Sequence, residues 1–409
     1  MILKKISLPK LSVSLLLLSL PLNFIAFSGL GNVYSSTLLI FTLFLLLVSV
    51  RFKRIFSKSD VLLSVVIFIS LLLFTILNVL FDGGHGLKMQ LIFAVIYFQS
   101  FLVFIISYYT LDKVKWDYIF KLYLFVGLLL FLRMAMEEPQ NLFGFSAIRG
   151  ERIEANFAGA VNNFALLIGL CVIISFFYIK NKTLKIIFSI ASLFVLILTM
   201  SRGALLGTII TFFLVAFYDT DSKTLKNLLR ISAAISFIAI VGLFYFDKID
   251  LVVTTVQDRF LGVFSGEASV KQFSSGRGII LSDIYNNHFV HSSIFEFLFG
   301  HGMGSIEFTV NGAPYESSHN IFMDFAYRNG VLFLLSYMFF FLYLLYKFIQ
   351  YRSKENLALF GIFVFLHFEL LVNPYLFAVQ MGWIYSFFLA GFLIRLKAQR
   401  NKNLESSIL

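Results

Sequence analysis

The chain has 409 residues, of which 59% are hydrophobic and only 13% carry a charge. Soluble domains are about one quarter charged, so the composition excludes a soluble globular enzyme and a disordered protein, and the single cysteine, Cys171, excludes a disulfide scaffold. The net charge of +11 would suit a nucleic-acid-binding protein, but in a membrane protein it reflects the preference for basic residues on the cytoplasmic side.

Apolar runs follow one another along the chain, and most approach the roughly 20 residues that cross a bilayer as a helix. The first run is followed at once by others and lacks a small-residue cleavage site, so we expect a span and not a signal peptide. The sequence therefore predicts an all-α polytopic membrane protein with about twelve transmembrane helices. The predicted spans are 11–29, 33–50, 61–80, 89–109, 117–136, 155–179, 186–200, 203–218, 231–246, 321–346, 357–373 and 377–394.

Basic residues alternate along the predicted connections. With the N-terminus in the cytoplasm, the even-numbered connections and the two tails hold 23 of the 33 basic residues. Such an excess marks cytoplasmic segments. The pattern predicts both termini in the cytoplasm and explains the net charge by topology, so we expect no nucleic acid as a partner.

One connection is far longer than the others. Residues 247–320 are predicted to form a large loop on the outer face, between nine spans in 1–246 and three spans plus a cytoplasmic tail in 321–409. Its apolar segments 260–264 and 294–299 are predicted to form short interfacial helices. Because loops of this length are uncommon without a role, we expect function on the outer face.

Arg202 is the first candidate site residue. It is the only charge between positions 186 and 218, and a turn at Ser201-Arg202-Gly203 divides this stretch into two helices. Each helix spans about 23 Å of a core of roughly 30 Å, so the turn is expected below the membrane surface. A buried arginine there calls for an anionic partner or a water-filled cavity, and its planar fork suits phosphate.

His319 is the second candidate. Ser317-Ser318-His319-Asn320 directly precedes a predicted span, and serine and asparagine are good helix N-caps. The positive end of a helix favours a neutral imidazole, which is a competent general base, and it attracts anionic phosphate. The interpretation to weigh against catalysis is a capping or interface histidine.

Further residues have weaker local signals. Arg277 lies in the polar turn Ser274–Gly278. Together with four other cations of the outer face, it could form an electropositive basin for a diphosphate; these are Arg149, Arg152, Arg259 and Lys271. His367 and Glu369 lie within a predicted span, where ionisable residues are site candidates. Arg328 is expected to pair with Asp324, four residues earlier. Gly300–Gly304 is predicted to be a turn. We find no metal-ligand spacing and expect neither a metal nor a cofactor.

The order of these motifs resembles the O-antigen ligase/polymerase superfamily. Ser201-Arg202-Gly203-Ala204 at a hairpin is followed by Ser275-Gly276-Arg277 and Phe299-Gly300-His301-Gly302 in the large loop, and then by His319-Asn320-Ile321-Phe322. The motifs cover about residues 195–335, while the N-terminal half is similar only in topology. The chain departs from the ligase-like pattern after Arg277, where Ile279-Ile280-Leu281 replace an aromatic residue.

The resemblance implies a GT-C-like, metal-independent, inverting glycosyltransferase of the bacterial inner membrane. Its donor would be a glycan on undecaprenyl diphosphate at the periplasmic face. His319 would be the general base, Arg202 and Arg277 would bind the diphosphate, and Arg149, Arg152 and Asn320 are further substrate-contact candidates.

Within the superfamily we favour the O-antigen polymerase, because both its substrates are lipid-linked and the chain is rich in phenylalanine. The expected partners are undecaprenyl-diphosphate-linked glycans, membrane lipids and a chain-length regulator protein. The ligase, which transfers polymer to lipid A–core, is the first alternative. A lipid or glycan transporter is the second, although the chain lacks the internal repeat typical of that class.

Overall fold

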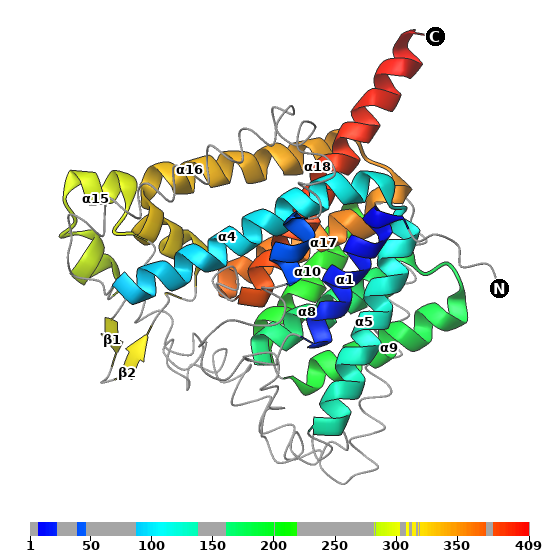
Figure 1. The fold of residues 1–409 in the computed structure, drawn as a ribbon, viewed down its shortest axis with the longest axis horizontal. Coiled ribbons are helices and arrows are strands. Elements are labelled where there is room, and N and C mark those ends of the chain that lie inside the picture. Colours follow the sequence, from blue (N-terminus) through cyan, green and yellow to red (C-terminus); the bar gives the residue numbers. More distant parts are fainter. Residues whose placement is uncertain are drawn as a thin grey trace.

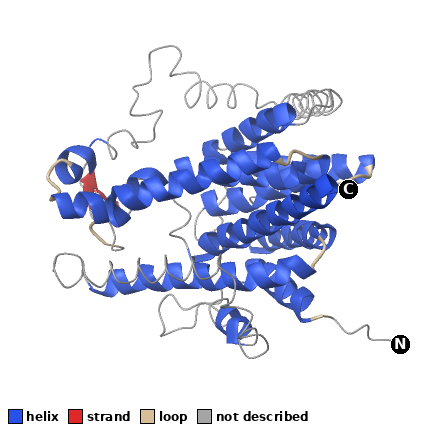
Figure 2. Cartoon of the chain, turned by 90° about the horizontal axis from the view of Figure 1, so that it is seen from above, coloured by secondary structure: helices blue, strands red, loops and turns tan. Residues whose placement is uncertain are grey.

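The computed structural model describes a bundle of helices (Figures 1 and 2). Within the described part of the chain, six helices are long and apolar enough to cross a membrane, which confirms the prediction of an all-α membrane protein. The predicted spans 61–80 and 231–246 lie outside it. The described residues are 7–22, 39–45, 87–137, 161–199, 201–218, 282, 284–302, 308–310, 313–315, 318, 320–373 and 379–408.

The helices of the bundle match predicted spans. They are α1 (Leu8–Leu22), α4 (Leu87–Thr110), α5 (Trp116–Glu137), α8 (Val161–Tyr178), α9 (Lys182–Leu198), α10 (Arg202–Tyr218), α16 (Ile321–Gln350), α17 (Leu357–Val372) and α18 (Val379–Ile408). A further helical stretch covers 39–45. The largest difference is α18, which was predicted to end near 394 and instead projects from the bundle as a long helix (Figure 1).

The remaining elements are short. They are the 3₁₀ turns η1 (Leu111–Lys113) and η5 (Lys354–Asn356), the π-helical turn η4 (Ile284–Phe289), the helix α15 (Ile294–Phe299), and the antiparallel strands β1 (Phe308–Val310) and β2 (Ala313–Tyr315). Three of these, α15, β1 and β2, lie together at one end of the molecule (Figure 1). The helix predicted over 294–299 is therefore confirmed, whereas 260–264 lies outside the described residues.

The centre of the bundle is α17, which packs against α8 and α10, while α4 packs against α18. Glycines allow this close approach, as is typical of transmembrane helices. A Cβ on Gly169 of α8 would overlap the ring of Phe365, and a Cβ on Gly207 of α10 would lie 2.9 Å from the ring of Phe368. The core is consequently built from phenylalanine side chains of α17 fitted against bare backbone of its neighbours.

Two hydrogen bonds join helix ends that the predicted alternation places on the same side. At one end, the Tyr178 hydroxyl at the end of α8 donates to the Asp117 carbonyl at the start of α5 (3.1 Å). At the other end, the Asn320 side chain before α16 donates to the Leu371 carbonyl at the end of α17 (3.4 Å). We call these the Asn356 end and the Asn320 end, after a residue central to each. That the Asn320 end faces the outside of the cell remains a prediction from the charge pattern.

Candidate functional site

The predicted site residues divide into described and undescribed positions. Arg202 is the first residue of α10, and Asn320 is the N-cap of α16. Both therefore begin helices, as the sequence predicted. The other four predicted residues, His319, Arg277, Arg149 and Arg152, lie outside the described residues.

Asn320 fixes the start of α16. Its side-chain oxygen accepts the backbone N–H groups of Phe322 (3.0 Å) and Met323 (3.2 Å), which is the usual bonding of an N-cap. Its side-chain nitrogen reaches Leu371 of α17 (3.4 Å). One side chain thus caps α16 and attaches it to the end of α17.

Ser318, which directly precedes position 319, is also held by hydrogen bonds. The Ser318 hydroxyl donates to the Asn320 carbonyl (2.7 Å) and accepts the Asn320 N–H (3.0 Å). The backbone N–H of Ser318 donates to Oδ1 of Asp324, one turn into α16 (2.8 Å). Both residues that flank position 319 are therefore bonded to the first turns of α16.

The start of α10 lies against the same end of α17. The Ser201 hydroxyl donates to the Asn162 side chain at the start of α8 (3.2 Å). A Cβ on Gly203 would lie 2.7 Å from Cγ2 of Val372 and 3.4 Å from Oε1 of Glu369. Because Asn320 bonds to Leu371, the first turns of α10 and α16 both contact the last turn of α17.

Buried charges surround this meeting point. Asp324 is 0% exposed, while Arg328 and Glu369 are each 1% exposed. Asp324 and Arg328 are one turn apart on α16, and both act electrostatically on Tyr97 of α4. The Glu369 carboxylate lies beside the first turn of α10, where the positive end of the helix stabilises a negative charge.

A break in α16 brings the 294–302 segment to this end. Gly330 has φ 82° and ψ 164°, a backbone conformation that glycine alone adopts readily. The carbonyls of Tyr327 and Arg328, whose helical partners would lie beyond the break, accept the N–H groups of His301 (2.8 Å) and Gly302 (3.0 Å). The segment Gly300–Gly302, predicted only as a turn, is a turn that closes the broken helix.

The approach is close enough to require glycine on both sides. A Cβ on Gly300, which has φ 86°, would overlap the Arg328 carbonyl, and a Cβ on Gly330 would overlap the Leu298 carbonyl. The ring of His301 stacks on that of Tyr327 with centroids 4.2 Å apart. The contact between α15 and α16 is thus made mainly by backbone and one aromatic stack.

His301 and Glu296 also make contacts within the 292–301 segment itself. Nε2 of His301 lies 3.2 Å from the Ser292 hydroxyl and 3.9 Å from a Glu296 carboxylate oxygen. Glu296 completes a capping box with Ser293 at the start of α15. The hydrogen bonds from the Ser293 side chain and backbone, with a smaller contribution from His301, lower the pKa of the Glu296 carboxyl.

The two ionisable residues predicted within the α17 span face different surroundings. Glu369 lies beside the first turn of α10, as described above. His367 instead packs among aromatic rings of α16, α17 and α18, with the Phe363 ring centroid 4.3 Å from its own. They do not form one site, and Glu369 is the one at the Asn320 end.

The arrangement offers chemistry suited to an anion. Two helix N-termini, those of α10 and α16, converge on α17, and the positive end of each helix dipole favours an anion. Within the described residues we find no group of three His, Cys, Asp or Glu side chains placed to hold a metal ion.

Comparison with known proteins identifies no family. No protein-family model matches the chain, and no curated protein matches its sequence.

Local sequence analysis missed the roles of Asp324 and His301. Asp324 was expected to form an ion pair with Arg328. Its bond to the Ser318 N–H could have been predicted, because Asp324 follows the cap residues by one helical turn. The bonds of His301 to α16 have no local signal, since they depend on a helix break nearly 30 residues away.

Proposed function

We propose that this protein is an O-antigen polymerase, an inverting glycosyltransferase that joins repeat units carried on undecaprenyl diphosphate. The observation that supports it best is that Gly203, next to Arg202 in the first turn of α10, and Asn320, the N-cap of α16, both contact the last turn of α17. The two motifs that define the resemblance are far apart in sequence and contact the same turn.

In this proposal the diphosphate of the donor binds at the Asn320 end. Arg202 and Arg277 neutralise its charge, and the positive ends of the α10 and α16 dipoles favour it further. The same groups stabilise the charge that grows on the diphosphate as the glycosidic bond breaks. The buried Glu369 carboxylate, next to Gly203, balances the positive charge gathered there when no substrate is bound.

His319 acts as the general base. It takes the proton from an acceptor sugar hydroxyl as that oxygen attacks the anomeric carbon of the donor, and the diphosphate leaves from the opposite face, which inverts the configuration. The bonds that hold Ser318 and Asn320 support this role, because a base must be held within hydrogen-bond reach of the proton.

The experiment that tests the proposal compares strains by the lipopolysaccharide they display. One strain lacks the protein, and the others express the natural chain, His319→Ala or Arg202→Ala. For a polymerase, the deletion and both variants give core carrying a single repeat unit and no ladder. Bare core with accumulating lipid-linked polymer would instead establish the ligase, the alternative glycosyltransferase.

Matched control variants separate loss of chemistry from loss of protein. His291→Ala removes an exposed histidine of the 284–302 segment, and Arg400→Ala removes an exposed arginine near the end of α18. Both controls should keep the ladder, and all four variants should reach the membrane in equal amounts. A normal ladder from His319→Ala would exclude that residue as the base.

The break in α16 favours a second candidate, a lipid or glycan transporter. Transporters bind substrates at the ends of broken helices, and Gly330 interrupts α16. The polymerase remains the better supported proposal because the carbonyls next to the break, of Tyr327 and Arg328, already accept bonds from His301 and Gly302. An unchanged ladder in the deletion strain would exclude both glycosyltransferases and favour transport.

A further inference from the structure

The break at Gly330 turns α16 into a helical hairpin. The ring centroids of Phe322 and Tyr337 lie 6.4 Å apart, whereas the backbones of these residues would be about 22 Å apart in a straight helix. Both side chains also line one groove, which lies between α10, α16 and α17. Residues 321–329 therefore form a short arm that returns along the first turns of a long arm, residues 331–350.

The long arm is the part of α16 that matches the thickness of a membrane. Its 20 residues are about 30 Å long, which equals the thickness of the hydrocarbon core. Its exposed apolar side chains begin at Leu332 and continue to Ile349, with Phe339 between them 70% exposed. Every residue of the short arm is instead buried or partly buried. Lipid is consequently expected to face the long arm and not the short one.

The far end of the long arm marks one boundary of the membrane. The Lys347 ammonium lies between 5.3 and 5.7 Å from the centroids of three tyrosine rings, those of Tyr343, Tyr346 and Tyr351. Tyrosine gathers at the interface between membrane and water, and lysine near a helix end reaches toward that interface. Gly330 precedes Lys347 by about 26 Å of helix. The break therefore lies close to the opposite boundary of the core.

Helix α15 is attached directly to the break. The Leu298 backbone lies so close to Gly330 that no side chain fits between them. The outward side chains of α15 are nevertheless apolar, since Ile294 is 75% exposed and Phe295 and Phe297 are also exposed. A helix that faces water presents polar residues on that side. These side chains are therefore suited to lipid.

The preceding turn, η4, extends this apolar surface. The ring of Phe289 packs edge-on against that of Phe297 with centroids 5.5 Å apart, so η4 and α15 form one unit. The carboxylate of Glu296 is used within that unit, where it accepts the Ser293 N–H (2.6 Å). We call the exposed apolar side chains of the unit the apical face; they are Val290, Ile294, Phe295 and Phe297.

We propose that the apical face binds the lipid surface of the membrane, in the leaflet nearer Asn320, and anchors the bend of the hairpin there. The partner is lipid because α15 is attached at Gly330, two residues before the lipid-facing side of the long arm begins. Apolar helix faces of this kind insert about 5–10 Å into the boundary between head groups and acyl chains.

The anchor has a consequence for the candidate site. Asn320 precedes the short arm, which returns from the bend, so it lies below the membrane surface. This is the depth that the sequence predicts for the turn at Arg202. The inference goes beyond the proposed function and does not depend on it, because it can be tested without any glycan.

The test measures the surroundings of a nitroxide label on the full-length protein in nanodiscs of phosphatidylethanolamine and phosphatidylglycerol. The label is attached to Ile294→Cys, after Cys171→Ala removes the one natural cysteine. Phe339→Cys, on the exposed side of the long arm, is the reference for lipid. Arg400→Cys, exposed near the end of α18, is the reference for water.

Collisions with oxygen report lipid, and collisions with a water-soluble nickel complex report water. For the label at 294, we expect about tenfold fewer nickel collisions than at 400, more oxygen collisions than at 400, and a depth shallower than at 339. Nickel collisions as frequent as at 400 would overturn the proposal. Few collisions with either reagent would show that protein covers the face, from another part of the chain or a second copy, and would also overturn it.

Two substitutions at one position provide the matched comparison. With the label moved to Val290→Cys, which also replaces Ile294→Cys if that variant does not fold, Phe295→Asp places a charge on the apical face and Phe295→Leu keeps the face apolar. We expect nickel collisions to rise several-fold in Phe295→Asp and to stay at the natural level in Phe295→Leu. Equal collision rates in the two would overturn the assignment of this face to lipid.

Discussion

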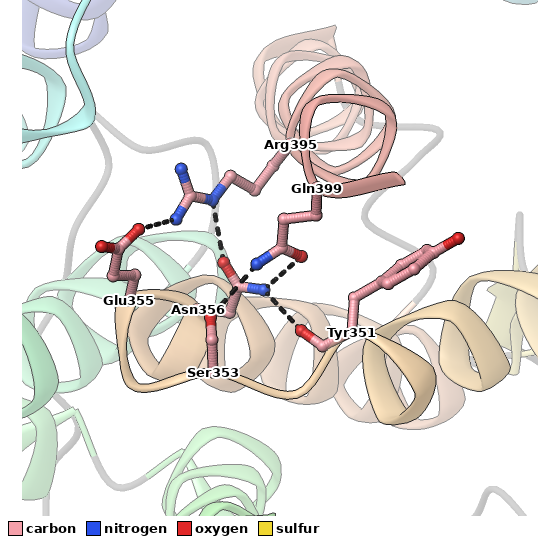
Figure 3. A network of polar contacts seen from close by, with 6 residues as sticks. All are labelled: Tyr351, Ser353, Glu355, Asn356, Arg395 and Gln399. Carbon is pink, nitrogen blue, oxygen red and sulfur yellow. Dashed lines mark hydrogen bonds and ion pairs between the residues drawn. The ribbon is translucent and has the colours of Figure 1, made fainter. Parts of the chain in front are cut away.

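The two ends of the bundle are both polar, but they are built differently. At the Asn356 end, the η5 turn between α16 and α17 is bonded to α18 through side chains (Figure 3). Asn356 is fully buried; it accepts a bond from Arg395 (2.8 Å) and donates to Gln399 (2.7 Å) and to the Tyr351 carbonyl (3.1 Å). At the Asn320 end, the bonds instead order backbone around position 319 and around the break in α16.

The difference separates a structural cluster from a candidate functional one. The side-chain oxygen and nitrogen of Asn356 are used by its neighbours, and Arg395 is also paired with Glu355 (2.5 Å). The Asn320 end places buried charge next to helix N-termini, where an anion is favoured. We therefore expect substitutions at the Asn356 end to lower stability and those at the Asn320 end to lower activity, except where the backbone itself is strained.

The largest effect on folding is expected from Gly330→Ala. An alanine would need an unfavourable backbone conformation, which costs about 1–3 kcal/mol, and its Cβ would overlap the Leu298 carbonyl. The variant should lose the docking of α15 and become sensitive to protease between 294 and 302. Ser336→Ala, an exposed change beyond the break whose hydroxyl bonds only within α16, is the control. Equal protease resistance of the two variants would contradict this account of the break.

The second effect concerns Asn356→Ala, which should lower the free energy of unfolding by about 1–3 kcal/mol because it leaves buried partners unsatisfied. The midpoint of thermal unfolding in detergent measures it. Gln399→Ala shares the network, so the double variant should lose less stability than the two single losses combined. Strict additivity would show that the bonds act independently. Transfer activity per folded molecule should not change.

The third effect is on activity. Asp324→Ala removes the acceptor of the Ser318 N–H, and a bond to a charged group contributes about 1.5–3 kcal/mol, so transfer should fall about tenfold or more. Asp324→Asn keeps an oxygen at the same position and should recover most of the activity. The measurement is the rate of transfer at equal protein abundance. Full activity in Asp324→Ala would show that Asp324 does not position the residues before α16.

The smallest effect is that of pH on α15. The pKa of the Glu296 carboxyl is lowered in the folded protein. Its contribution to the stability of α15 is therefore fully present above the ordinary glutamate pKa of about 4.3, and it is lost as pH falls through the lowered value. A capping interaction contributes about 1 kcal/mol. Hydrogen exchange of residues 293–299, corrected for its intrinsic pH dependence, should increase in acid. Glu296→Gln should remove this pH dependence, because it removes the carboxylate that titrates and keeps an oxygen that can accept the Ser293 N–H.

The sequence predicted the helices better than it predicted their joints. The turn at Ser201 to Gly203, the cap before Ile321 and the short helix at 294–299 all carry local signals, namely a lone charge, cap residues and an apolar run. The break at Gly330 carries none, because a single glycine in an apolar helix is common in membrane spans. The same holds for the bond between Asn320 and Leu371, which joins residues on different helices.

By itself, the sequence predicted which of the described segments are helices, since apolar length responds directly to the bilayer; the orientation of their ends stays a prediction from the basic residues. It also indicated Arg202 and Asn320 one at a time, as residues at helix starts. Only the tertiary structure decided that the first turn of α10 and Asn320 meet the last turn of α17, that the 294–302 segment closes a broken helix, and that a groove lies between three helices. These features depend on side-chain fit between distant segments, which hydropathy does not encode.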